Sequence, residues 1–168
     1  MSARIDVAAS GTANVATGLP VLDHLLTLLA RSGRFALALE LPPSDAEAEV
    51  ADAGRALGEA LAPLLRAEGA AGHGAGAMPA AEALAHLVLE VSEEPLLASN
   101  VDLTSAHAGG LATDLASRFL RELTEAAGLT LHVRLIDGED SQHVLEAIFK
   151  ALGVALANAC RGGHIPTS

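Results

Sequence analysis

The chain contains two copies of one segment. "EAEVADAGRALGEAL" at 47–61 and "QHVLEAIFKALGVAL" at 142–156 share their ending and the apolar rhythm before it. A second pair, 23–41 and 117–135, repeats at nearly the same spacing and passes in both copies from a helical pattern through a glycine into an alternating strand. Self-similarity at one spacing is the mark of a duplicated structural unit. The sequence therefore predicts two similar halves.

Hydrophobic periodicity predicts the order helix, strand, helix in each half, with two further strands ahead of it. We place the halves at 1–70 and 71–168 and expect them to form one compact domain. The second pair of leading strands is predicted to be a hairpin, and the Gly-rich stretch 68–79 is interpreted as a linker. The predicted fold class is α+β, each half being a sheet covered by two helices. The predicted elements are strands 4–8 and 12–17, helix 21–32, strand 35–41, helix 45–66, strands 84–91 and 95–103, helix 111–126, strand 129–136 and helix 141–160.

Charge and composition limit the classes of partner. The 168 residues carry a formal net charge of −11 and are 51% hydrophobic. The negative charge argues against binding nucleic acid or an anionic membrane, and no apolar run is judged long enough to span a bilayer. A single cysteine, Cys160, excludes an internal disulfide and fits a reducing cytosol. Because the first residues also lack a signal-peptide pattern, we expect a soluble, cytoplasmic protein.

Several motifs together resemble one enzyme family. "TGLPVLDHLLTLLARSGRF", "DAGRALGEAL", "MPAAEAL", "AAGLTLHVRL" and "QHVLEAIFKALGVAL" are similar, from about Thr17 to the C-terminus, to the imidazoleglycerol-phosphate dehydratases of histidine biosynthesis. The resemblance implies two half-domains of the ribosomal protein S5 domain 2 type and assembly into trimers or, with metal, a 24-subunit shell. It also implies two manganese ions, held by histidines and glutamates from both halves, that bind the substrate imidazole as an imidazolate.

The metal-binding motifs of that family are only partly kept. "DHLL" keeps His24 of the family's Asp-His-Met-Leu, and "QHVLEA" keeps His143 and Glu146 of His-His-x-x-Glu-Ala. The other ligand positions are occupied by Ser32, Glu47, Ala48, Ala51, Arg118 and Gln142. Alanine offers no donor and arginine brings a positive charge, so the two-metal site is expected to be lost. No cofactor is expected beyond one weakly bound metal, whose candidate ligands are His24, Glu47, His143 and Glu146.

The positions that would bind the substrate phosphate are also changed. "SEEP" places Glu94 where the family has the arginine of Ser-Gly-Arg-Pro, and a carboxylate repels phosphate. The family's C-terminal Pro-Ser-Thr-Lys-Gly is reduced to "IPTS" at 165–168, and its N-terminal motif with a catalytic glutamate has no clear match. Lys150 is kept and is the remaining candidate phosphate ligand.

Each retained residue also has a structural interpretation. His143 and Glu146 are three residues apart on one helix face, a spacing that suits a metal but also a hydrogen-bonded pair at a helix surface or subunit contact. His24 is either a relic ligand or a buried, hydrogen-bonded histidine. Lys150 is either a phosphate ligand or a solvated or ion-paired helix residue.

Three functions remain open. The favoured one is a catalytically impaired family homologue, a homo-oligomer with a structural, regulatory or ligand-binding role. The second is a dehydratase that still converts imidazoleglycerol phosphate to imidazole acetol phosphate. The third is an enzyme repurposed for other chemistry, using His24, His143, Glu146 and Glu47 around one metal or none, with the first three as its candidate catalytic residues.

Overall fold

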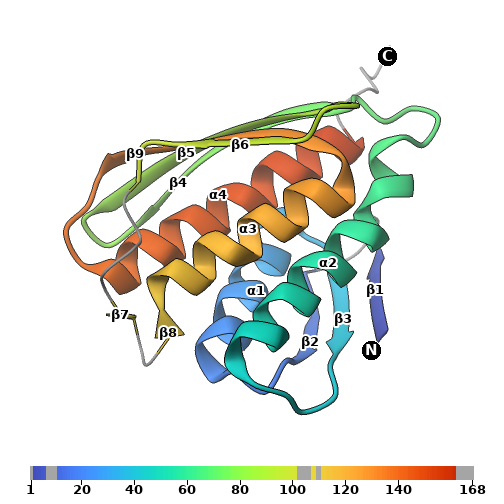
Figure 1. Ribbon diagram of the computed structural model, residues 1–168. Coiled ribbons are helices and arrows are strands. Elements are labelled where there is room, and N and C mark those ends of the chain that lie inside the picture. The colour runs from blue at the N-terminus through green and yellow to red at the C-terminus, as the bar shows by residue number, and fades with distance from the viewer. Residues whose placement is uncertain (1, 7–10, 102–106, 109–110, 162–168) are drawn as a thin grey trace.

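Helices lie between two sheets in this protein (Figure 1). The computed structural model describes residues 2–6, 11–101, 107–108 and 111–161. The helices are α1 (Pro20–Gly33), α2 (Ala46–Leu65), α3 (Thr113–Ala127) and α4 (Ser141–Arg161). The strands are β1 (Ser2–Asp6), β2 (Ala13–Ala16), β3 (Ala36–Glu40), β4 (His73–Ala80), β5 (Ala83–Val91), β6 (Leu96–Ser99), β7 (His107–Ala108), β8 (Leu111–Ala112) and β9 (Leu129–Asp137). The predicted α+β class is confirmed.

The two main sheets have related orders. The first runs β1-β3-β2, with β1 antiparallel and β2 parallel to the central β3. The second runs β4-β5-β9-β6, with β5 antiparallel and β6 parallel to β9. In each half the strand between the two helices therefore has one antiparallel and one parallel neighbour. This shared arrangement is what the internal repeat predicts.

Each long helix packs against the short helix of the other half. A Cβ added to Gly153 of α4 would lie 2.2 Å from the Leu29 carbonyl oxygen of α1. A Cβ added to Gly58 of α2 would lie 2.6 Å from the Ala126 Cβ of α3. These are the glycines of the two repeated "ALGxAL" endings. The repeat keeps glycine there because the helix backbones approach each other too closely for a side chain, and the exchange gives both halves one shared core.

Two predictions about the second half are wrong. Residues 73–79 of the proposed linker belong to β4, whose small residues are needed because α4 lies directly beneath it. A Cβ at Gly74 would meet the Ala155 oxygen at 2.2 Å, and one at Gly76 would meet the Ala151 oxygen at 2.4 Å. The predicted hairpin is also incorrect, since β5 pairs with β4 and β9 whereas β6 pairs with β9 alone.

Smaller differences concern element ends. Asp45 caps α2 by accepting a hydrogen bond from the Ala48 N–H at 2.8 Å. The predicted helix 111–126 begins two residues early, because 111–112 form β8. The predicted strands 4–8 and 95–103 extend at 7–8 and 102–103 outside the described residues. The boundary near residue 70 stays a prediction.

The last helix, α4, is long and apolar enough by length and composition to cross a membrane, contrary to the sequence-based judgement. However, 72% of its most apolar window is buried inside the protein, against β4, β5 and α1. Its apolar surface is therefore part of the core, and α4 gives no indication of a membrane protein.

Candidate functional site

The structure brings three side chains together where α1 meets α4. His24 Nε2 of α1 lies 3.5 Å from Glu146 Oε2 of α4, and Gln142 Nε2 donates a hydrogen bond of 2.8 Å to the same oxygen. Gln142 Oε1 is buried and has no hydrogen-bond partner among the described residues. His24 is 51% exposed, so it is not the buried histidine of the structural interpretation. This cluster retains a base and a carboxylate next to each other.

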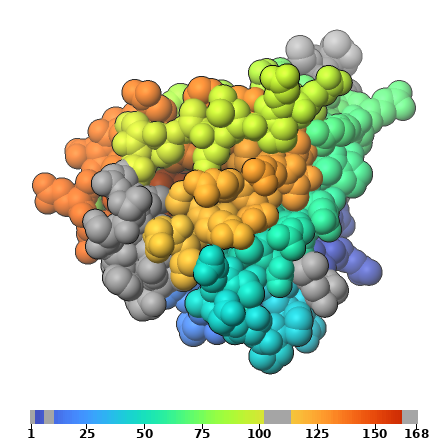
Figure 2. Space-filling model, in the orientation of Figure 1, coloured from blue at the N-terminus to red at the C-terminus, as the bar shows by residue number. Residues whose placement is uncertain are grey.

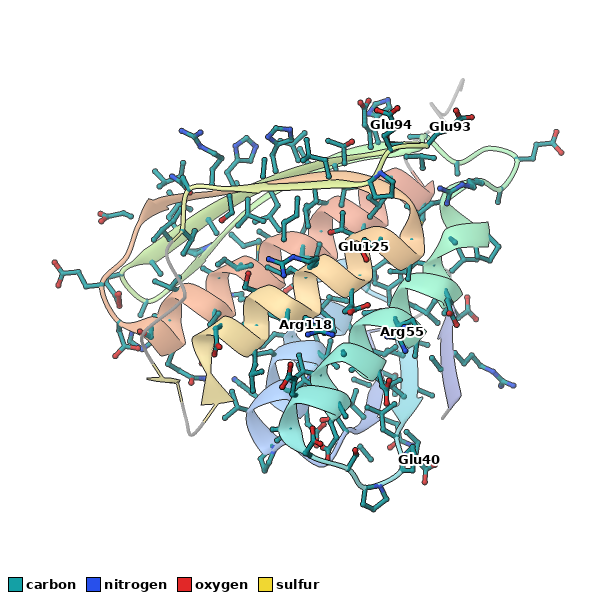
Figure 3. The ribbon with its side chains drawn as sticks, viewed as in Figure 1. Glu40, Arg55, Glu93, Glu94, Arg118 and Glu125 are labelled. Carbon is teal, nitrogen blue, oxygen red and sulfur yellow. The ribbon has the colours of Figure 1, made fainter. Side chains whose placement is uncertain are left out.

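The matching face of the other helix pair, α2 and α3, holds a ladder of ion pairs instead. Arg118 of α3 stands 3.3 Å from Glu47 of α2 and donates to Glu122 at 3.0 Å. Glu122 also faces Arg55 of α2 at 3.6 Å, and Arg55 pairs with Asp52 at 3.4 Å. Figure 3 shows Arg55 and Arg118 on the facing helices. Glu47 and Arg118, which stand at two metal-ligand positions of the family, are thus paired with each other across the two halves.

The His143 side chain faces Glu82, which is not one of the candidate metal ligands. Its Nδ1 contacts Glu82 in the turn between β4 and β5, with Asp140 at 3.9 Å. The Glu139 N–H, the His143 ring and the Asp140 N–H all donate to Glu82 and lower its pKa to about 2. The hydrogen bond that His143 donates to Glu82 in turn raises the pKa of His143. The pair ties the β4–β5 turn to the start of α4.

Lys150 has a structural contact in place of a phosphate. Its Nζ donates a 2.7 Å hydrogen bond to the Pro79 carbonyl of β4, and Asn158 Nδ2 donates one of 2.8 Å to the Ala75 carbonyl. Both bonds satisfy carbonyls of an edge strand, which would otherwise be free to pair with another chain. Glu94 lies near the end of the second sheet, away from Arg118 (Figure 3). The C-terminal residues 165–168 lie outside the described part of the chain.

The manganese set implied by the family resemblance does not fit this arrangement. Within residues 2–6, 11–101, 107–108 and 111–161, no group of three or more His, Cys, Asp or Glu side chains is placed to hold a metal ion. His24 and Glu146 are adjacent, but His143 faces Glu82 and Glu47 faces Arg118. A guanidinium in contact with a candidate ligand also opposes a cation there.

A cavity of about 330 Å³ lies along α3, next to the start of α2. Its lining residues are Glu47, Asp114, Leu115, Ser117, Arg118 and Arg121. Sequence reasoning singled out Glu47 and Arg118 but missed Asp114, Ser117 and Arg121. Their spacing was the available signal, because residues 114, 117, 118 and 121 share one helix face. Figure 2 shows α3 and α2 side by side on this surface.

Comparison with known proteins identifies the family. The family model for imidazoleglycerol-phosphate dehydratase matches residues 17–156. A dehydratase of that name from Pelobacter propionicus is 36% identical over 94% of this chain and 83% of its own length. One from Syntrophobacter fumaroxidans is 39% identical over 95% of this chain and 83% of its own.

Solved structures agree with these relatives. The crystal structure of imidazoleglycerol-phosphate dehydratase from Staphylococcus aureus superposes with a TM-score of 0.83 at 30% identity, covering 92% of this chain and 90% of that one. The enzyme from Pyrococcus furiosus, in complex with (S)-C348, gives a TM-score of 0.80 at 28% identity, covering 95% of this chain and 87% of that one. With this sequence similarity and this shared fold, the chain belongs to the imidazoleglycerol-phosphate dehydratase family.

Proposed function

We propose that this family member has lost the two-metal dehydratase activity and serves as a ligand-binding or structural protein. The observation that carries the proposal is the Glu47–Arg118 ion pair, with N and O atoms 3.3 Å apart. The family resemblance places metal-binding histidines at both positions. In this chain the positive charge beside Glu47 is supplied by the Arg118 guanidinium, so this carboxylate is neutralised without a metal ion.

The changes at the phosphate-binding positions support the same proposal. Lys150 is engaged with the Pro79 carbonyl at 2.7 Å, and Glu94 would repel a phosphate. Loss of metal ligands and loss of phosphate ligands are separate changes, so restoring one would not restore the reaction. His24 and Glu146 remain as the two adjacent relics of the catalytic set.

The alternative proposal is that the chain is still a dehydratase of imidazoleglycerol phosphate. It is favoured by the names of relatives that are 36% and 39% identical to this chain. A repurposed enzyme is the third proposal, and the exposed His24 beside Glu146 supports it because a carboxylate orients an imidazole for proton transfer. At most one weakly bound metal is proposed for the impaired homologue and for the repurposed enzyme.

Metal content and complementation separate these proposals. The purified protein is dialysed against manganese and analysed for bound metal, with the dehydratase from Staphylococcus aureus as the positive control. We expect less than one tightly bound manganese per subunit and no growth of a dehydratase-deficient histidine auxotroph. Two tightly bound manganese ions per subunit, together with growth, would establish the dehydratase instead.

We further propose that the protein is a cytoplasmic homo-oligomer, a trimer or larger. The family resemblance supports the assembly, and the single cysteine Cys160, whose pKa burial raises to about 11, supports a role without disulfide chemistry. Light scattering coupled to size-exclusion chromatography measures the mass. A monomer at micromolar concentration would contradict the proposed assembly without affecting the proposed loss of activity.

A further inference from the structure

The cavity along α3 contains an unusual combination of charges. Glu47 and Asp114 are acidic, while Arg118 and Arg121 are basic, and all four line the same space. Arg118 is already held by Glu47 and by Glu122, which is only 16% exposed. Its guanidinium is therefore fixed in place before any ligand arrives, which reduces the entropy lost on binding.

Two charges of the cavity are left unpaired. Among the described residues, Asp114 and Arg121 have no hydrogen-bond or ion-pair partner, and the Ser117 hydroxyl between them has none either. Asp114 and Arg121 are seven residues apart on one helix face, so their Cα atoms are separated by about 10 Å along the helix axis. At this separation the two side chains do not form an ion pair with each other. A small molecule placed between them can reach both.

The signs of these charges select the class of ligand. A simple anion in the cavity would lie beside Asp114 and Glu47, and a simple cation would lie beside Arg121 and Arg118. Each would be attracted by two of the four charged side chains and repelled by the other two. A molecule that carries both an ammonium and a carboxylate meets an opposite charge at each end, and Leu115 adds an apolar contact. The volume of about 330 Å³ lies at the lower end of ligand pockets, which suits one amino acid.

We propose that this cavity binds a free, zwitterionic α-amino acid, with its carboxylate at Arg121 and Ser117 and its ammonium at Asp114. The proposal rests on the proposed function, because the cavity lies where Glu47 and Arg118 have replaced metal ligands.

Calorimetric titration with L-leucine tests the proposal. Leucinamide, which lacks the carboxylate, and N-acetyl-L-leucine, which lacks the ammonium, are matched probes. We expect saturable binding of L-leucine and at least tenfold weaker binding of both derivatives, since each loses one charge pair. Equal binding of N-acetyl-L-leucine would overturn the proposal in favour of a plain carboxylate site, and so would the absence of saturable L-leucine binding.

Two variants locate the binding. Arg121→Gln and Asp114→Asn are each expected to weaken L-leucine binding at least tenfold, while Arg134→Gln, an exposed arginine on β9, leaves it unchanged. Binding that survives both cavity variants would place the ligand elsewhere and overturn the proposal. Turnover and manganese content are measured on the same preparations, so a failure to bind L-leucine is distinguishable from a retained dehydratase activity.

Discussion

Arg66 and Arg161 make equivalent contacts in the two halves of the protein. Arg66, at the end of α2, donates a 2.8 Å hydrogen bond to the Ala127 carbonyl at the end of α3. Arg161, at the end of α4, donates a 2.6 Å hydrogen bond to the Gly33 carbonyl at the end of α1. Each arginine thus places a positive charge on the C-terminus of a helix from the other half, where the helix dipole favours it. The pair ties the duplicated units together.

Replacing Arg161 is predicted to destabilise the fold. Arg161→Ala removes hydrogen bonds to the Gly33 and Arg34 carbonyls and the stacking of the guanidinium 5.1 Å above the Phe35 ring. We expect a loss of about 2 kcal/mol in the free energy of unfolding, measured by urea denaturation. Arg134→Ala is the control and should change stability by less than about 0.5 kcal/mol. Equal midpoints for the two variants would show that Arg161 contributes nothing specific.

The close approach of α4 to α1 gives a second prediction. Gly153→Ala would place a Cβ 2.2 Å from the Leu29 carbonyl oxygen, and neither backbone can move without disturbing the core. Alanine favours a helix by about 1 kcal/mol over glycine, but overpacking costs about 1–3 kcal/mol and more when backbone atoms clash. We expect a net loss of about 2 kcal/mol, measured by thermal unfolding.

Gly69→Ala is the matched control for that variant. Gly69 has a φ of +87°, and in the described part of the chain nothing lies within 4 Å of an added Cβ, so only backbone strain is introduced. Its expected destabilisation is about 1 kcal/mol. A Gly153→Ala protein as stable as the unmodified chain would mean that the helices separate easily, contrary to the packing described.

Periodicity predicted most of the fold but not every strand. The helices and β3, β5 and β9 carry regular apolar patterns that burial against the core requires. β4 has no such pattern, because Gly74 and Gly76 face α4 without side chains. A strand whose inward positions are glycines has the composition of a linker. The pairing of β6 with β9 instead of β5 depends on the sheet topology, which a local pattern does not contain.

The candidate site could also be predicted only in part, because several of its contacts join residues that are far apart in the chain. The motifs identified His24, His143 and Glu146, and the structure places His24 beside Glu146. The partner of His143 is Glu82, 61 residues away along the chain, and no spacing rule connects them. Contacts between helices of different halves, such as Glu47 with Arg118, likewise require the folded arrangement.

The Glu82–His143 pair predicts a pH dependence. The pKa of His143 is raised above 6.5, so its stabilisation is present below pH 6.5 and is lost as the pH rises through the folded-state pKa. The pKa of Glu82 is lowered from 4.5 to about 2, so its stabilisation is present above pH 4.5 and is lost as the pH falls towards 2. The pair is at full strength between pH 4.5 and 6.5.

NMR titration of the His143 ring tests this assignment. In the unmodified protein its midpoint should lie above 6.5, and Glu82→Gln should lower it because the carboxylate is the main cause of the shift. A His143 midpoint that is unchanged by Glu82→Gln would show that the two side chains do not interact in solution.

The ladder between α2 and α3 gives the last prediction. Arg118→Met leaves Glu122, which is 16% exposed, with Arg55 at 3.6 Å as its remaining partner. We expect a loss of about 1 kcal/mol in the free energy of unfolding at low salt, and a smaller loss in 1 M NaCl because salt screens exposed charges. Arg121→Met, one turn along the same helix and without a partner in the described structure, should change stability by less than about 0.5 kcal/mol. If the two variants lost the same free energy at both salt concentrations, the contacts of Arg118 with Glu47 and Glu122 would not stabilise the junction between the halves.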